Sequence, residues 1–233
     1  MAKELTFKQG MKASLPTVLG YMGIGFAMGV VGKGVGLSVW AIGLMSILVY
    51  GGSSQFILCG LLSIHAPLLS IVLTVFLVNL RHFLMSLSVA QTFKNEGLFI
   101  RIGIGSLLTD ESYGVVITEI LRKQPVTASW MYGLNLTAYI SWIIATILGA
   151  LFGGFITDPA KYGLDFALVA MFLGLFLFQV EIPLKKQTKS TVQILVTILI
   201  SLIVLMRIST AEIAVLGATL LGCLIGVMTH ESE

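Results

Sequence analysis

The longest uncharged stretch of the chain constrains its fold more than any other feature. No Asp, Glu, Lys or Arg occurs between Gly34 and Leu80. A helix needs about 20 apolar residues to cross a bilayer, so this stretch is long enough for two such helices. Only 11% of the 233 residues are charged and 57% are apolar. In soluble domains, about 25% of the residues are charged and about 45–50% are apolar. The chain has too few polar residues to cover a water-soluble globule, and we expect a polytopic membrane protein.

The remaining uncharged runs divide the chain into predicted membrane spans. A break within the longest stretch is expected near Pro67, because proline lacks a backbone donor and favours the start of a helix. The sequence predicts an all-α transmembrane helix bundle of about eight spans, at least one of them interrupted, which forms a single domain over residues 1–233. The predicted spans are 13–32, 38–61, 67–91, 102–121, 130–155, 164–181, 190–207 and 211–228.

The positions of Lys and Arg predict the orientation of this bundle. With eight spans and a cytoplasmic N-terminus, eight of these residues fall in cytoplasmic loops and five in outer loops, the bias that the positive-inside rule requires. Without a span at 102–121, the cluster Lys185–Lys189 would lie outside, so we keep that span. Both termini are then expected in the cytoplasm. The predicted outer set is Lys33, Lys94, Arg101, Lys161 and Arg207.

A pair of glycines interrupts the second predicted span. The segment Tyr50–Phe56 reads YGGSSQF, and each glycine weakens a helix by about 1 kcal/mol relative to alanine. Broken helices are tolerated at membrane depth where they line a cavity, and their free amides can bind a carboxylate. Small residues at this position would also allow a close contact between two helices. Both interpretations stay open.

The third predicted span contains Asn79, Arg81 and His82. Arg81 either pairs with a carboxylate inside the membrane, or the span ends early and the long side chain reaches the interface. His82 and Ser86 share a helix face, but a Ser–His hydrolase needs a third, orienting group, and no motif supplies one. We predict that the protein is not an enzyme. A histidine near an acid is better suited to relaying protons.

Two adjacent carboxylates, Asp110 and Glu111, occupy the centre of the predicted span 102–121. Both cannot be ionised cheaply in a medium of low dielectric constant, so we expect one of them to bind and release a proton. The alternative is a break between two short interfacial helices, with both acids in water. Asp165, near the predicted outer surface, is expected only to cap a helix.

The sequence contains no motif for a cofactor or metal. Cys59 and Cys223 lie in apolar runs without the spacing of metal ligands, and the glycines at 32–36 form no nucleotide-binding loop. We expect no cofactor, no bound metal and no nucleic-acid partner, and any transport to be driven by a gradient or by the substrate itself. Three pairs of glycines have the spacing that lets membrane helices approach closely: Gly25 and Gly29, Gly149 and Gly153, and Gly222 and Gly226.

Five segments together resemble the AzlC family of branched-chain amino acid exporters, the large subunit of a bacterial two-component permease. The resemblance implies export of leucine, isoleucine, valine and similar amino acids across the bacterial cytoplasmic membrane. It also implies a small hydrophobic partner subunit of the AzlD type. One departure is Gly52, where the family usually has alanine. The matching segments are Gly23–Phe26, Tyr50–Phe56, Asn79–Phe83, Leu108–Tyr113 and Tyr162–Ala167.

An aliphatic amino acid is a zwitterion, so its site needs donors for a carboxylate, an acid for an ammonium group and an apolar pocket. We therefore predict an exporter that exchanges its substrate for protons. The alternative is an ion channel or inorganic-ion carrier in which the Gly-Gly-Ser-Ser-Gln segment forms a filter. The predicted substrate-binding residues are Phe26, Gly51, Gly52, Ser53, Ser54, Gln55, Phe56, Asn79 and Arg81, and the predicted proton-coupling residues are His82, Asp110 and Glu111.

Overall fold

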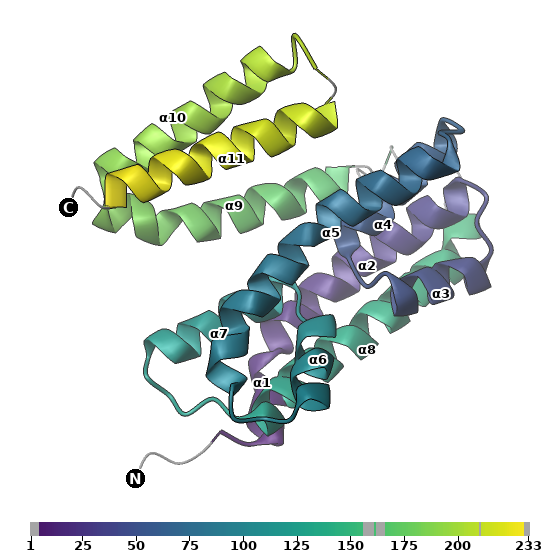
Figure 1. The fold of residues 1–233 in the computed structure, drawn as a ribbon. Coiled ribbons are helices and arrows are strands. Elements are labelled where there is room, and N and C mark those ends of the chain that lie inside the picture. Colours follow the sequence, from purple (N-terminus) through teal and green to yellow (C-terminus); the bar gives the residue numbers. More distant parts are fainter. Residues whose placement is uncertain (1–4, 156–160, 162–165, 210, 231–233) are drawn as a thin grey trace. The chain divides into compact units, whose positions relative to one another are not determined.

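The computed structural model is all-helical in the residues that it describes, which are 5–155, 161, 166–209 and 211–230 (Figure 1). This confirms the predicted all-α membrane bundle. The segment around Asp165 lies outside the described residues. Within the described ranges, four helices are long and apolar enough to cross a membrane, judged by length and composition: Leu15–Gly34, Leu68–Phe93, Ala128–Phe155 and Thr188–Leu205.

The helices fall into two compact units, Met1–Met171 and Phe172–Glu233, and a single domain stays a prediction. The second unit holds most of α9 (Ala167–Lys186), together with α10 (Thr188–Leu205) and α11 (Ala211–His230). Within it, Gly222 of α11 lies against Ile198 of α10, and Gly226 lies against Ile194. This confirms the close approach predicted for that glycine pair.

In the first unit, α2 (Leu15–Gly34) and α8 (Ala128–Phe152) run parallel as a central pair. A side chain on Gly29 would overlap the carbonyl oxygen of Thr146, and one on Gly149 would overlap that of Phe26. A Cβ on Gly25 would come 2.9 Å from the Cβ of Ala145. The backbones therefore touch, as the glycine spacing predicts. The short helix α1 (Phe7–Ala13) precedes α2 and packs on the start of α8.

The stretch 38–61 forms two half-helices, α3 (Val39–Leu48) and α4 (Gly52–Ser63). The chain breaks at Tyr50, whose φ of 39° is a left-handed conformation that strains a non-glycine residue. Gln55 Nε2 donates to Ser46 Oγ at 3.0 Å. In a continuous helix these residues would lie about 13 Å apart along the axis. The second half therefore folds back beside the first and returns to the end of the unit where α2 finishes.

The next helix, α5 (Leu68–Ala90), crosses the unit in the direction opposite to α2 and α8. It starts where α4 has returned. Its last turn and the following turn η1 (Gln91–Phe93) supply Val89 and Phe93 to an apolar cluster with Trp130, at the start of α8. The C-terminal end of α5 therefore lies beside the N-terminal end of α8.

The stretch 102–121 also forms a folded-back pair, α6 (Leu98–Ser106) and α7 (Asp110–Leu121). Ser86 of α5 donates to the carbonyl of Gly105, near the end of α6, at 3.1 Å. From there α7 follows α5 toward its C-terminal end, since Arg81 contacts Asp110 and Ser88 contacts Tyr113. The chain thus returns to the end at which α6 began, and α8 starts there.

Both broken stretches are therefore re-entrant hairpins, which enter the first unit from opposite ends and turn near its middle. We call α3–α4 the first hairpin and α6–α7 the second. The sequence predicts Lys94 and Arg101 on the side opposite the N-terminus, whereas the second hairpin places both residues at the end that carries α1. Among residues 5–155, the Lys and Arg at that end are Lys8, Lys12, Lys94, Arg101, Arg122 and Lys123, with Lys33 at the other.

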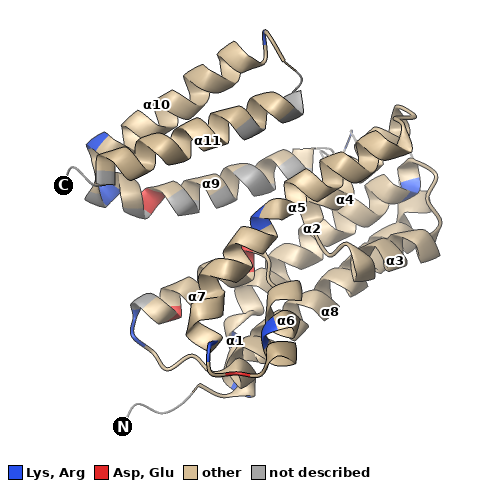
Figure 2. Ribbon diagram, viewed as in Figure 1, with Lys and Arg blue, Asp and Glu red and all other residues tan. Residues whose placement is uncertain are grey.

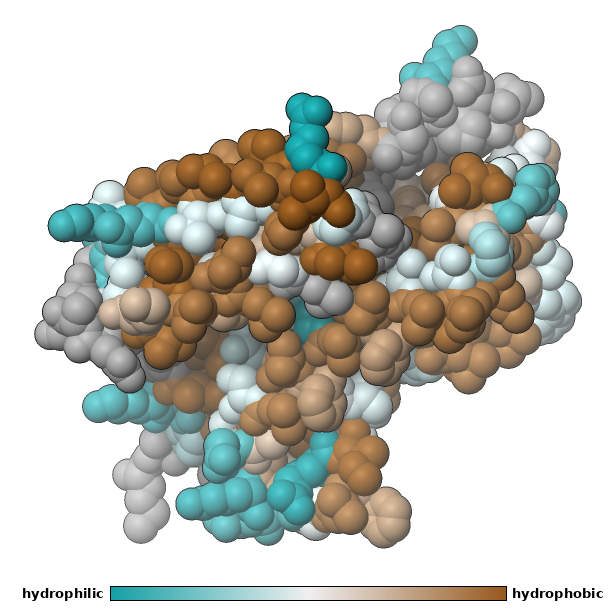
Figure 3. All heavy atoms as spheres, turned by 45° about the horizontal axis from the view of Figure 1, so that its top comes forward, coloured by the Kyte–Doolittle hydropathy of each residue, from teal (hydrophilic) through white to brown (hydrophobic). Residues whose placement is uncertain are grey.

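Each hairpin packs on α8 through its own apolar cluster. Ile42 and Tyr50 of the first hairpin join Trp142 in one cluster, and Leu108 and Val116 of the second lie in the other. Large apolar side chains cover much of the face shown in Figure 3, as expected for a surface in contact with lipid. Most charged residues of the described chain lie near helix ends (Figure 2).

The second hairpin predicts which loops are accessible from the same side of the membrane. In a Cys223→Ser background, Lys94→Cys and Gln124→Cys should react with a membrane-impermeant maleimide from one side, and Lys33→Cys from the other. Eight straight spans would place positions 94 and 124 on opposite sides. Labelling of these two positions from opposite faces of the membrane would therefore contradict the re-entrant arrangement.

Candidate functional site

The tips of the two hairpins meet in the middle of the first unit and enclose a small polar chamber. Its volume is about 20 Å³, whereas a cavity needs roughly 10–15 Å³ to hold one water molecule. The chamber in this conformation has room for water but not for an amino acid. Its walls are Tyr50, Gly51, Gly52 and Ser53 of the first tip, Thr109, Asp110 and Glu111 of the second, and Tyr21, Arg81, His82 and Trp142 of the crossing helices.

An ion pair between Arg81 and Asp110 joins α5 to the second tip. Arg81 Nη2 lies 3.0 Å from Asp110 Oδ2 and also donates to Ser53 Oγ of the first tip at 2.6 Å. The Asp110 side chain is only 12% exposed, and His82 Nε2 lies 3.9 Å from the same carboxylate oxygen. Removing charges from water is costly, so a buried pair persists only where further hydrogen bonds support it. Arg81 thus holds both hairpin tips.

The second acid has a separate partner. Tyr21 of α2 donates its hydroxyl proton to Glu111 Oε2 at 2.7 Å, and the hydroxyl also lies 2.9 Å from Thr109 Oγ1. The Tyr21 ring packs edge-on against Trp142, with centroids 4.9 Å apart. Asp110 and Glu111 therefore point to different helices, which keeps two neighbouring negative charges from competing for one cation.

Two helix N-termini face the chamber. The helix α4 begins at Gly52 and α7 begins at Asp110, and both run away from the chamber. The first amides of a helix have no partner within it, and this end carries a partial positive charge. Together with Arg81 they can bind an anionic group, while Asp110 and Glu111 can bind a cationic one. The site has the chemistry to hold both ends of a zwitterion.

Gln55 supports the first tip on the side that faces away from the chamber. Its Oε1 accepts a hydrogen bond from Trp142 Nε1 at 2.7 Å, and its Nε2 donates to Ser46. Ser46 in turn contacts the hydroxyl of Thr146 on α8 at 2.8 Å. All of these groups are buried. Gln55 therefore fixes the hairpin to α8 and is not on the chamber wall.

Glycine at position 52 allows the indole of Trp142 to lie against the first tip. A Cβ at this position would come 3.0 Å from the ring atom Cη2. An alanine here would require the ring to move by a few tenths of an ångström.

The chamber brings together seven of the predicted residues: Gly51, Gly52, Ser53, Arg81, His82, Asp110 and Glu111. Their roles stay predictions. The structure does not place Phe26 or Phe56 on the described wall of the chamber, and Phe56 is packed in the apolar cluster beside Trp142. Ser54 is also off this wall, because its hydroxyl turns toward Asn79 and donates a hydrogen bond to the amide oxygen.

Four wall residues were absent from the predicted site: Tyr21, Tyr50, Thr109 and Trp142. Thr109 carries a recognisable signal, because it caps α7 and forms a capping box with Ser112. The contact of Tyr21 with Glu111 joins residues 90 positions apart, and no local pattern reports it. The hydroxyl of Ser86 donates to the carbonyl oxygens of His82 and Gly105 and not to the imidazole, so a Ser–His hydrolytic pair is not formed.

A family model described as AzlC protein matches residues 16–156, which include every residue of the chamber. The chain belongs to the AzlC family. It is 27% identical to the inner membrane protein YgaZ of Escherichia coli (strain K12), over 94% of this chain and 89% of the relative. An uncharacterised membrane protein of Archaeoglobus fulgidus is 34% identical over 76% and 77% of the two chains.

The branched-chain amino acid transport protein AzlC of Bacillus subtilis (strain 168) is 25% identical, over 74% of this chain and 67% of the relative. No solved structure matches the chain. The AzlC-family chain is therefore a multi-pass membrane protein with a role in transport.

The Arg81–Asp110 pair predicts a strong energetic coupling between the two side chains. Arg81→Gln and Asp110→Asn should each destabilise the purified protein by roughly 3 kcal/mol, the lower end of the range for buried pairs, because each leaves a partly buried charge without its partner. The double variant should cost less than the sum of the single variants, as measured by thermal unfolding.

Glu119 and Arg122 provide the matched control for this cycle. They form a pair at 2.9 Å on α7 in which the Arg122 side chain is 66% exposed and that of Glu119 22%, and water around the guanidinium group should limit their coupling to about 1 kcal/mol. If the losses of unfolding free energy in the two single variants simply add in the double variant, as expected for the control pair, the structural role of the Arg81–Asp110 pair is contradicted.

Proposed function

We propose that this protein is a secondary transporter that exports branched-chain and similar aliphatic amino acids across the bacterial cytoplasmic membrane in exchange for protons. The observation that carries the proposal is the Arg81–Asp110 pair at the meeting point of two re-entrant hairpins. The name of the Bacillus subtilis relative supports the substrate class.

In this mechanism the substrate binds between Arg81 and Asp110 and separates the two side chains. The carboxylate of the amino acid replaces Asp110 at Arg81, where Ser53 and the first amides of α4 lie close by. The ammonium group then pairs with Asp110 or Glu111. Each protein charge exchanges one partner for another, so the substrate is desolvated without leaving a buried charge alone. Uncharged analogues cannot make this exchange.

The proton is carried by the acids that bind the ammonium group. Protonation of the Asp110 or Glu111 carboxylate from the outer side removes its negative charge and releases the ammonium group there. Loss of the same proton to the cytoplasm restores the binding site. Two adjacent groups can relay the proton. The imidazole of His82 lies 3.9 Å from the Asp110 carboxylate, and the Tyr21 hydroxyl is hydrogen-bonded to Glu111.

The hairpins suggest how the chamber opens. Because they enter from opposite ends, displacement of one tip would connect the chamber to one side only. Alternating displacement of the two tips would move substrate across without a continuous pore, as in other transporters with discontinuous helices.

The distribution of cationic residues supports the orientation. Six Lys and Arg residues lie at the α1 end of residues 5–155, and Lys33 lies at the other end. By the positive-inside rule the α1 end is cytoplasmic. The first hairpin then enters from outside and the second from the cytoplasm.

The family resemblance also supports assembly with a small hydrophobic subunit of the AzlD type.

Proton coupling can be tested with labelled leucine in everted membrane vesicles. Uptake should accelerate when the lumen is made acidic. In Asp110→Asn and Glu111→Gln variants the rate should no longer respond to the pH gradient, because the neutral amides cannot bind and release the proton.

Glu119→Gln is the control, since Glu119 lies on the same helix but outside the chamber. It should keep the response of the wild-type protein. If both chamber variants also respond to the pH gradient like the wild type, the proposed coupling is eliminated.

A further inference from the structure

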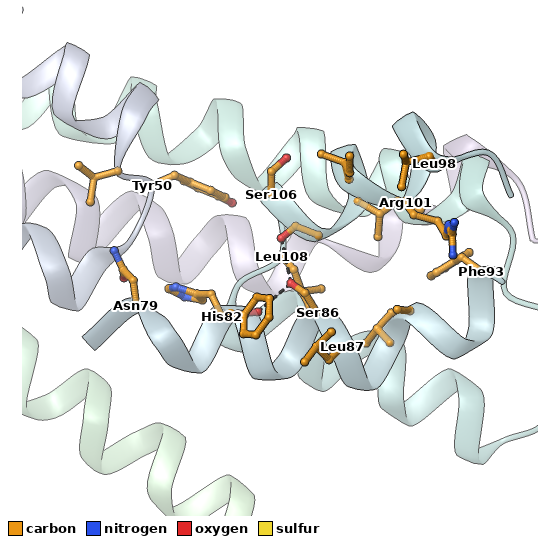
Figure 4. Close-up of a pocket in the computed structure, with 17 residues that line it drawn as sticks. Tyr50, Asn79, His82, Ser86, Leu87, Phe93, Leu98, Arg101, Ser106 and Leu108 are labelled. Carbon is orange, nitrogen blue, oxygen red and sulfur yellow. Dashed lines mark hydrogen bonds between the residues drawn. The ribbon is translucent and has the colours of Figure 1, made fainter. Parts of the chain in front are cut away.

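A second, larger cavity lies beside the chamber, between α5 and α6. Its volume is about 610 Å³, within the roughly 300–1,000 Å³ typical of small-molecule sites. Figure 4 shows Tyr50, Asn79 and His82 at one end of this pocket, and Phe93, Leu98 and Arg101 at the other. Asn79 and Phe93 are 14 positions apart, which corresponds to about 20 Å along a helix. The pocket thus extends from the hairpin tips toward the end of the unit that carries α1.

The pocket and the chamber share a wall. Tyr50 and His82 line both cavities, so these two side chains are the partition between them. The Tyr50 side chain is 7% exposed, packs edge-on against Tyr139 and sits on the strained backbone of the first tip. A space large enough for an amino acid therefore adjoins a chamber that is too small for one.

The far end of the pocket carries an unbalanced cation. Arg101 Nε is buried and has no hydrogen-bond partner among the described residues. The described lining of the pocket contains no Asp or Glu. A buried charged donor without an acceptor is costly, and a guanidinium group is suited to a carboxylate. The remaining lining near Arg101 is apolar, and includes Leu87, Leu98 and Ile102.

We propose that this pocket is a loading site, where the substrate binds before it passes the Tyr50–His82 partition into the chamber. Arg101 takes the carboxylate, and Leu87 and Ile102 contact the aliphatic side chain. The ammonium group has no acidic partner at this level and stays hydrated. The inference rests on the proposed function and adds to it a second, cytoplasmic-side site that recognises only an anionic head and an apolar tail.

The polar groups inside the pocket favour a small solute over a lipid acyl chain as its occupant. Arg101 lines it together with Asn79 and His82, and an acyl chain would leave the buried Arg101 Nε without an acceptor. A solute that moves toward the chamber instead meets more polar surroundings, which suits a molecule about to be held by both of its charges.

Cysteine protection tests the loading site directly. Ser106→Cys is made in a Cys59→Ala, Cys223→Ser background, and its reaction rate with a small thiol reagent is measured in proteoliposomes. Ser63→Cys is the matched control: both serines are exposed and donate to the carbonyl three residues earlier, but Ser63 lies outside the pocket. The probes are leucine, 4-methylpentanoate, which lacks the ammonium group, and leucinamide, which lacks the carboxylate.

At about ten times its dissociation constant, a bound probe should slow labelling of Ser106→Cys about tenfold. We expect this from leucine and 4-methylpentanoate but not from leucinamide, and no effect at Ser63→Cys. Arg101→Gln should weaken protection about tenfold or more, Arg101→Lys should retain part of it, and Lys94→Gln, which removes an exposed cation nearby in the sequence, should leave it unchanged.

Several outcomes overturn the loading site. These are protection by leucinamide equal to that by leucine, protection that survives Arg101→Gln, and a labelling rate that follows the anionic lipid content of the vesicles but not the probes. Transport of leucine without any protection would overturn the loading site and leave the proposed function standing. Protection by 4-methylpentanoate without leucine transport would overturn the proposed function and leave the anion site standing.

Discussion

The ion pair between Arg81 and Asp110 is the interaction on which the arrangement of the first unit depends. Each hairpin turns in the middle of the first unit, and a helix that stops at membrane depth exposes backbone groups that lipid cannot satisfy. Two such ends are tolerated because they face one another across a polar chamber. Arg81 contacts Ser53 of one tip and Asp110 of the other, so a single guanidinium group holds both breaks together.

The same interaction explains why the site is suited to a zwitterion. A pair of opposite charges in a nearly dry chamber is stable only while the charges stay paired. A ligand with one charge would leave one member of the pair alone, whereas an amino acid supplies a partner for each. In the proposed mechanism the chamber selects for the two charges, and the larger pocket beside it, of about 610 Å³, has room for the substrate.

The sequence predicted the helices well, because long apolar runs and their interruptions are local features. It did not predict that 38–61 and 102–121 fold back. A half-helix of about ten residues has the same composition as half of a crossing helix, and only contacts such as Ser46 with Gln55 reveal the reversal. Arg81 and Asp110 could be singled out because charges are rare at membrane depth. Tyr21 could not, because its polar tip belongs to a largely apolar side chain and its partner is distant in the sequence.

An experimental structure of the protein with leucine bound is the most direct test of the central claim. We expect the leucine carboxylate within hydrogen-bonding distance of Arg81 and the ammonium group within hydrogen-bonding distance of Asp110 or Glu111. Arg81 and Asp110 should then no longer be in contact. Leucine held elsewhere, with the Arg81–Asp110 pair intact in every state of the transport cycle, would contradict it.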